Sequence, residues 1–115
     1  MSALALLLAG AALAPGRVQV AADEFSLTLS RPWLRAGPAI VQLVDYGEDE
    51  HDLALRRQAV GARTFRIRAT RPGGRRELEL RLLPGRYSLW CTLADHRASG
   101  MRATLLVRRA QDGSA

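Results

Sequence analysis

The sequence predicts an all-β protein, an antiparallel Greek-key β-sandwich or barrel of seven to eight short strands. Apolar and polar residues alternate in three segments, 24–30, 64–68 and 77–82. A period of two is typical of half-buried strands. Turn-forming residues separate such segments, and apart from the apolar amino terminus no segment has the period of a helix; the turns are Gly37-Pro38, Gly47, Gly61, Pro72-Gly73-Gly74, Pro84-Gly85 and Ser99-Gly100.

The strand segments differ in how their apolar residues are arranged. In residues 24–30 the apolar set begins with Phe25, and in residues 77–82 it begins with Leu78. Because successive side chains of a strand point to opposite faces, each set is expected to face the interior. Residues 39–44, AIVQLV, form a more continuous apolar run and are expected to be a central strand.

The amino terminus, residues 1–16, is apolar through Ala14 and too short for an ordinary transmembrane span. It resembles the apolar region of a secretory signal, although no basic residue precedes it. An ordinary apolar first element is the alternative. We expect an exported, periplasmic or extracytoplasmic protein whose leader is either cleaved or kept as a membrane anchor, followed by one domain (17–110) and a polar tail (111–115).

The charge of the chain gives little indication of nucleic-acid binding. It has 17 Arg and Lys residues together and 11 acidic residues, for a net charge of +6. The basic residues, all arginines, are spread along the sequence, and no aromatic platform is interleaved with them. We therefore expect no nucleic-acid partner.

Four residue types with metal-binding chemistry are rare in this chain. Cys91 is the only cysteine, His51 and His96 are the only histidines, and Met101 is the only methionine besides Met1. Two imidazoles, a thiolate and a thioether are the ligands of a mononuclear blue-copper site, which predicts one Cu(I)/Cu(II) ion per chain. Structural zinc is the nearest alternative, but methionine is a poor zinc ligand. The remaining alternative treats all four as ordinary packing residues.

The alternation also predicts where these side chains point. Three of them are in phase with apolar residues of their own strands and are expected to face the interior near one rim of the sandwich: His51 with Leu53 and Leu55, Cys91 with Tyr87 and Leu89, and Met101 with Leu105 and Val107. His96 is expected in the loop between the last two strands.

Residues 84–107, PGRYSLWCTLADHRASGMRATLLV, resemble the carboxy-terminal signature of the plastocyanin-like cupredoxins, and residues 47–55, GEDEHDLAL, resemble the segment that supplies their first histidine. The resemblance covers residues 18–107 and implies a cupredoxin-like fold. It also implies that His51, Cys91, His96 and Met101 are the copper ligands.

One residue departs from the family pattern. Many members have Asn or Ser after the first histidine, where this chain has Asp52. Asp52 is expected either to pair with Thr92 and brace the ligand loop or to face solvent opposite Leu53. A carboxylate near the metal, with Asp95 beside His96, would favour Cu(II) and lower the reduction potential.

The predicted function is that of a one-electron carrier between redox partner proteins, without a substrate and without enzymatic activity. The partners are expected to be acidic or membrane-bound. Arg97 and Arg102 next to His96 predict acidic partners, because a positive face attracts them. The protein is expected to be a monomer. The alternatives are a copper carrier or storage module that delivers the ion to another protein, and a metal-free interaction domain.

Overall fold

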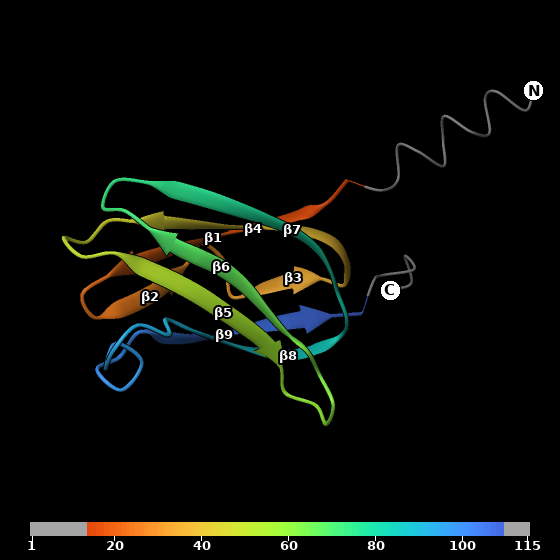
Figure 1. Ribbon diagram of the computed structural model, residues 1–115. Helices are drawn as coiled ribbons and strands as arrows, with labels where there is room; N and C mark the ends of the chain where they lie inside the picture. The colour runs from red at the N-terminus through yellow and green to blue at the C-terminus, as the bar shows by residue number, and fades with distance from the viewer. Residues whose placement is uncertain (1–13, 110–115) are drawn as a thin grey trace, which may run out of the picture.

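The computed structural model describes residues 14–109 and places nine β-strands in them (Figure 1). The strands are β1 (Gly16–Asp23), β2 (Ser26–Leu29), β3 (Trp33–Arg35), β4 (Gly37–Asp45), β5 (His51–Arg57), β6 (Thr64–Thr70), β7 (Arg75–Leu82), β8 (Gly85–Trp90) and β9 (Arg102–Arg108). The leader and the tail predicted at the two ends lie outside the described residues, except for residues 14–16. No helix in the described range is long and apolar enough to cross a membrane.

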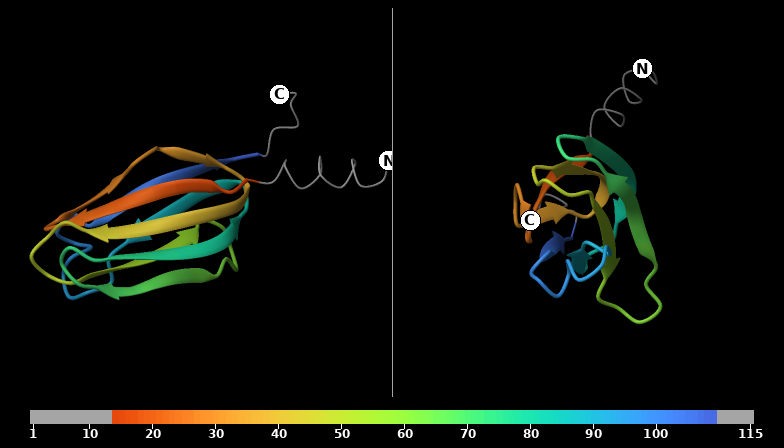
Figure 2. Two further views of the ribbon diagram at one scale, coloured as in Figure 1. Left: turned by 90° about the horizontal axis from the view of Figure 1, so that it is seen from above. Right: turned by 60° about the vertical axis from the view of Figure 1, so that its left-hand side comes forward.

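The strands form two sheets, with the orders β2-β1-β4-β7 and β3-β9-β8-β5-β6. Figure 2 shows the two layers from above and from one end. The predicted β-sandwich is confirmed, with nine strands where the sequence pattern predicted seven to eight. The continuous apolar segment is β4, which lies between β1 and β7 as predicted for a central strand.

Two of the strand pairs are parallel, which the antiparallel prediction did not include. β1 pairs with β4 from Gly16 opposite Ala39 to Ala22 opposite Asp45, and β3 pairs with β9. Parallel neighbours cannot be joined by a hairpin. Here the chain reaches the second sheet as β3 and then returns as β4, so β1 and β4 run in the same direction.

The core lies between the two sheets and follows the predicted alternation. In β1, for example, Val18, Val20 and Ala22 are buried while the residues between them are more exposed. Leu53 and Leu55 of β5 belong to the same core from the other sheet, and both are at most 1% exposed. Phe25 is an exception to the prediction, because it lies in the turn before β2 and is 46% exposed.

One end of the sandwich gathers connections that are far apart in the sequence. The β1–β2, β4–β5 and β8–β9 connections all lie at the left-hand end of Figure 1. The parallel pairing explains the first two connections, because it brings the carboxyl ends of β1 and β4 to the same end of the sheet. There the Tyr46 N–H donates to the Ala22 carbonyl at 2.8 Å. The candidate site lies at this end.

Candidate metal centre

The structure places the four predicted ligands at strand ends and in one loop. His51 is the first residue of β5, Cys91 directly follows β8, and Met101 directly precedes β9. All three are 0% exposed, which confirms that they face the interior. His96 lies in the β8–β9 connection, as predicted, and is partly exposed.

His51, Cys91 and His96 meet although His51 comes forty positions before Cys91 in the sequence. One potential ligand atom from each lies within 4.8 Å of those of the other two. The Cys91 Sγ is 3.5 Å from the His96 Nδ1, and the two imidazole centroids are 5.0 Å apart. A sulfur and two ring nitrogens at this spacing could hold one metal ion.

Met101 joins this group through its backbone. Its N–H donates to the His96 carbonyl at 2.9 Å, and its carbonyl accepts from the Cys91 N–H at 3.1 Å. Its side chain is fully buried with the apolar core around Cys91. The fourth predicted ligand is therefore held next to two of the others at the base of the loop.

The protonation chemistry of the group suits a metal ion. The His51 Nδ1 is buried and has no hydrogen-bond partner among residues 14–109. A buried polar atom without a partner lowers stability, whereas a metal ion would use its lone pair.

Burial raises the pKa of the Cys91 thiol, so without a metal it is neutral at neutral pH. Metal binding would displace its proton.

Asp52 braces the loop that carries Cys91 and His96. One carboxylate oxygen of Asp52 accepts from the Thr92 N–H at 2.6 Å, and the other accepts from the Thr92 hydroxyl. The predicted pairing with Thr92 is confirmed, and Asp52 is also partly exposed on the outer face of β5, while Leu53 next to it is buried. Thr92 directly follows Cys91, so the pair links the strand of one candidate ligand to the backbone of another.

Hydrogen bonds within the loop hold its remaining part in a compact turn. The Ser99 N–H donates to the Asp95 carbonyl at 3.0 Å, and the Gly100 N–H donates to the Arg97 carbonyl at 3.1 Å. Gly100 has a φ of +127°, and a Cβ added there would be 2.7 Å from the Phe25 carbonyl oxygen. Glycine is therefore required where the loop crosses the β1–β2 turn.

Two residues of the β1–β2 turn lie at the site and were not predicted from the sequence. The Phe25 ring lies 5.3 Å from the His96 ring, centroid to centroid, and the Glu24 carboxylate contacts the His51 Nε2. The sequence does contain one signal for the turn. Asp23 and Glu24 are two adjacent acidic residues between the alternating run of β1 and that of β2, where the alternation predicts the start of a strand.

Backbone groups also hold the Glu24 carboxylate. Its Oε1 accepts from the Glu48 N–H at 2.8 Å, and its Oε2 accepts from the Asp49 N–H at 3.3 Å. The pKa of Glu24 is lowered chiefly by the Glu48 N–H and then by the hydrogen bond with His51. Both interactions favour the ionised carboxylate.

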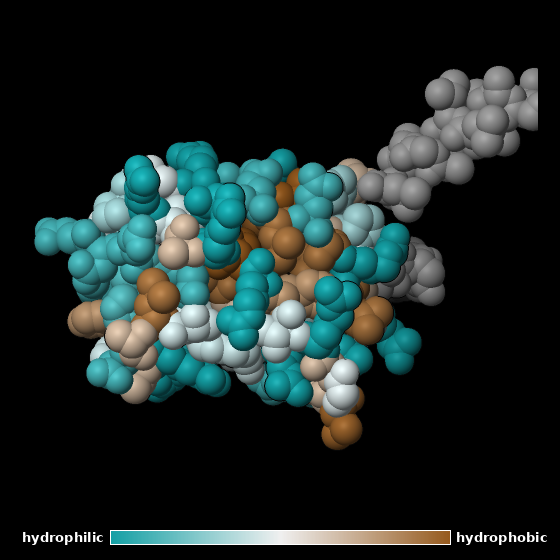
Figure 3. All heavy atoms as spheres, viewed as in Figure 1, coloured by the Kyte–Doolittle hydropathy of each residue, from teal (hydrophilic) through white to brown (hydrophobic). Residues whose placement is uncertain are grey.

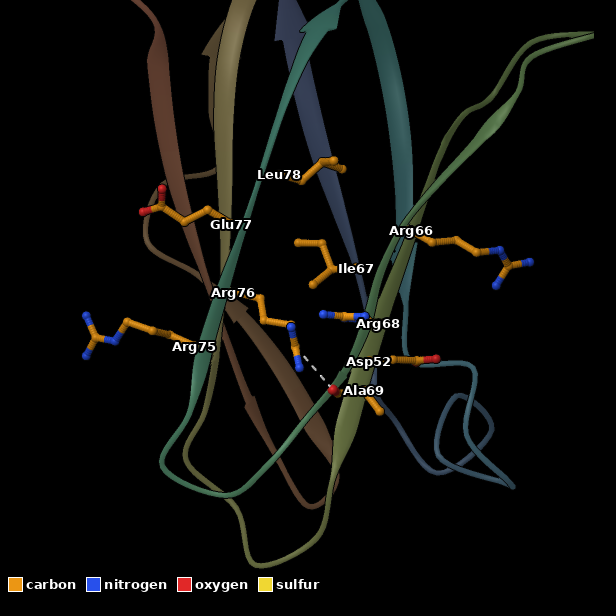
Figure 4. Close-up of a pocket in the computed structure, with 9 residues that line it drawn as sticks. All are labelled: Asp52, Arg66, Ile67, Arg68, Ala69, Arg75, Arg76, Glu77 and Leu78. Carbon is orange, nitrogen blue, oxygen red and sulfur yellow. Dashed lines mark hydrogen bonds between the residues drawn. The ribbon is translucent and has the colours of Figure 1, made fainter.

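A surface hollow lined by many charged residues does not include any of the four candidate metal ligands. Figure 4 shows the hollow between β6 and β7, lined by side chains that include Arg66, Arg68, Arg75 and Arg76. The Arg76 Nε donates to the Ala69 carbonyl at 3.3 Å, across the edges of the two sheets. Figure 3 shows this face as largely hydrophilic, with apolar side chains visible near its centre.

Neither a protein-family model nor a curated protein sequence matches the chain. Solved structures do. Reduced auracyanin from the photosynthetic bacterium Roseiflexus castenholzii has 15% identity and a TM-score of 0.66, covering 82% of this chain and 98% of that chain. Auracyanin A, a blue copper protein from Chloroflexus aurantiacus, has 12% identity and a TM-score of 0.65, with 83% and 100% covered.

An enzyme is also among the similar structures. A multicopper oxidase has 13% identity and a TM-score of 0.60, and the match covers 83% of this chain but 45% of that one. At such identities the similarity concerns the fold, and a fold by itself does not determine a function. The chain has the cupredoxin fold, an all-β sandwich of two sheets, and at one end of it a group of side chains that could hold a metal ion.

Proposed function

We propose that the protein binds one copper ion in a mononuclear type 1 site of His51, Cys91, His96 and Met101 and carries single electrons between redox partners. The observation that carries this proposal is the buried, unpartnered His51 Nδ1 beside the Cys91 sulfur and the His96 ring. A thiolate and a thioether suit Cu(I), and imidazoles suit both oxidation states. Bound copper would supply the one-electron Cu(I)/Cu(II) couple.

The protein would keep these donors in place while an electron enters or leaves. His51 is fixed in a strand, and Cys91 and Met101 are fixed by backbone hydrogen bonds to each other. All three are fully buried, so they keep water away from the inner side of the site. Donors that move little on a change of charge lower the energy needed for reorganisation, which suits electron transfer.

The donor set favours an electron carrier over an enzyme. With Met101 the site has four protein donors, whereas catalytic metal sites keep a position open for water or substrate. The auracyanin matches cover nearly the whole of those proteins, while the match to the oxidase covers less than half of it. Both observations support an electron carrier over an oxidase.

The partner would approach His96, the partly exposed member of the group. Phe25 lies beside it and is 46% exposed, which gives this rim an apolar contact surface. Arg97 and Arg102 flank it; the Arg97 guanidinium lies 4.5 Å from the centre of the Trp90 ring, and Arg102 donates to the Arg97 carbonyl at 3.1 Å. Such a rim would attract an acidic partner.

Titration of the metal-free protein with Cu(II) tests the proposal. We expect one ion per chain and an intense visible band from thiolate-to-copper charge transfer. Cys91→Ser, which is nearly isosteric, should abolish the band while the far-ultraviolet circular dichroism stays that of a β-protein. A colourless wild-type complex, or a band that survives in Cys91→Ser, would rule out a type 1 site.

A second measurement separates a carrier of electrons from a module that delivers copper. The loaded protein is reduced and reoxidised repeatedly in the presence of a Cu(I) chelator. A carrier should keep its copper and regain its visible band in every cycle. Loss of the copper to the chelator on the first reduction would instead support delivery.

A further inference from the structure

The side chain of Glu24 reaches His51 from the tip of the β1–β2 connection. The two residues are 27 positions apart in the sequence, and the Glu24 Oε2 contacts the His51 Nε2. His51 is fully buried, and the Glu24 side chain is 21% exposed. A mostly buried carboxylate therefore lies on the side of the His51 ring opposite its unpartnered Nδ1.

The Glu24 carboxylate is not free to turn away from His51. Backbone N–H groups of Glu48 and Asp49 donate to its two oxygens, at 2.8 and 3.3 Å. Gly47 packs so closely on it that an added Cβ would overlap the carboxylate. The β4–β5 connection therefore closes over Glu24 and aims it at the ring.

This contact decides which nitrogen of His51 holds the proton. An ionised carboxylate can only accept hydrogen bonds, so the Nε2 must be the donor. A neutral ring has one N–H, which leaves the lone pair on Nδ1. Nδ1 is the buried atom without a hydrogen-bond partner in the described part of the chain.

Glu24, Asp45 and His51 also form a group that could itself be considered for a second metal ion, since their ligand atoms lie within 4.8 Å of one another. The hydrogen bonds argue against that use. The Glu24 oxygens already accept three of them, and the His51 Nε2 carries a proton. An ion there would have to break these bonds.

We propose that Glu24 is a positioning residue that acts on the metal through His51, and this rests on the copper site proposed above. Glu24 holds the ring with its Nδ1 toward the metal and increases the electron density that the ring donates. The negative charge of this carboxylate, hydrogen-bonded to the ring nitrogen that does not face the metal, stabilises Cu(II) more than Cu(I), so Glu24 lowers the reduction potential.

Glu24→Gln tests this in the full chain, because glutamine keeps the shape and an acceptor oxygen but removes the charge. Loss of such an outer partner typically weakens metal binding about 10- to 100-fold. We expect that loss for Cu(II) and a smaller loss for Cu(I). Each tenfold decrease in the Cu(II) affinity relative to the Cu(I) affinity raises the reduction potential by about 59 mV. Glu79→Gln, an exposed position in β7, removes the same charge and should leave both affinities unchanged.

Nuclear magnetic resonance of the metal-free protein provides a readout that does not depend on copper. In a His96→Gln background, His51 is the only histidine, and its Nε2–H should give a downfield signal that exchanges slowly with water. Glu24→Gln should move that signal upfield and speed its exchange, and Glu79→Gln should not.

The outcomes separate this inference from the copper site itself. A wild-type protein that gives no type 1 band overturns the proposed function, while the metal-free signal still reports on the contact between Glu24 and His51. A normal band with equal Cu(II) affinity and equal potential in wild type and Glu24→Gln overturns the positioning role. A His51 ring protonated on Nδ1 overturns it as well.

Discussion

Asp52 and Thr92 are joined by two hydrogen bonds across forty residues of sequence, one from the Thr92 N–H at 2.6 Å and one from its hydroxyl. Asp52 directly follows His51, and Thr92 directly follows Cys91. The pair therefore ties together the chain segments of two candidate ligands. It also places a carboxylate where many cupredoxins have a neutral side chain.

Two substitutions of Asp52 separate bracing from charge. Asp52→Ala removes both hydrogen bonds, and we expect it to lower the free energy of unfolding by about 1–3 kcal/mol. In Asp52→Asn the amide oxygen can still accept from the Thr92 N–H, and the amide N–H can donate to the Thr92 hydroxyl oxygen. Stability should therefore change little while the loss of charge raises the reduction potential. Denaturant unfolding and voltammetry measure the two effects. Equal potentials in wild type and Asp52→Asn would show that the charge does not tune the site.

Met101 should tune the potential without being required for copper binding, because an axial thioether is a weak, long ligand. Met101→Gln supplies a harder oxygen donor that favours Cu(II), so the potential should fall. Met101→Leu removes the donor, so the potential should rise. Both side chains are close to methionine in volume, so the fold should survive. Voltammetry decides the matter, and potentials that do not move in opposite directions would make Met101 a packing residue.

Gly100→Ala should destabilise the protein by about 1–3 kcal/mol and disturb the ligand loop, because φ is +127° and the added Cβ would be 2.7 Å from the Phe25 carbonyl oxygen. Gly37→Ala is the matched control, with a φ of +120° and no atom within 4 Å of the added Cβ. Thermal unfolding and the visible spectrum of the copper form compare them. Equal losses would mean that the contact with Phe25 has no cost beyond the backbone strain.

Asp45 should make the stability of the metal-free protein depend on pH. It is fully buried, its Oδ2 has no hydrogen-bond partner in the described residues, and burial raises the pKa of its carboxyl group above the ordinary 3.8. The unfolded chain therefore releases this proton at a lower pH than the folded protein does. Below pH 3.8 Asp45 is protonated in both states and its burial costs no charge. As the pH rises from 3.8 through the folded pKa, the buried carboxyl group has to ionise, and the free energy of unfolding falls.

Asp45→Asn removes this titration and keeps an oxygen that can accept from the Gly47 N–H. We expect its free energy of unfolding to increase relative to wild type as the pH rises above about 4, by roughly 1.4 kcal/mol for each unit by which the pKa is raised. The other ionisable groups are the same in both proteins, so the difference isolates Asp45. The exposed Asp49→Asn should show no such trend, and a parallel pH profile for Asp45→Asn would contradict the prediction.

The candidate ligands could be predicted because their placement depends on short-range rules. Cys91, His96 and Met101 lie within eleven residues, and the alternation of β8 and β9 determines which of them face the core. His51 follows the same rule at the start of β5. The kind of metal site proposed above could also be predicted, because few metal sites use this combination of donors.

Glu24 and Phe25 could not be placed in the same way. They reach the site because β1 pairs in parallel with β4, which brings the β1–β2 connection to the end where β5 begins. Alternation would allow Phe25 to face the core as the first residue of a longer strand, and only the turn at Asp23–Ser26 moves it to the rim beside His96.

The sequence by itself determined the strand periodicity, the inward direction of three candidate ligands and the composition of the donor set. The tertiary structure alone decided the order of the strands, the two parallel pairs and the contact between Glu24 and His51. A period of two specifies which face of a strand is buried, but not which strand lies beside it. That choice depends on burying the apolar faces of all nine strands at once, so residues far apart in sequence meet only when the whole sandwich has formed.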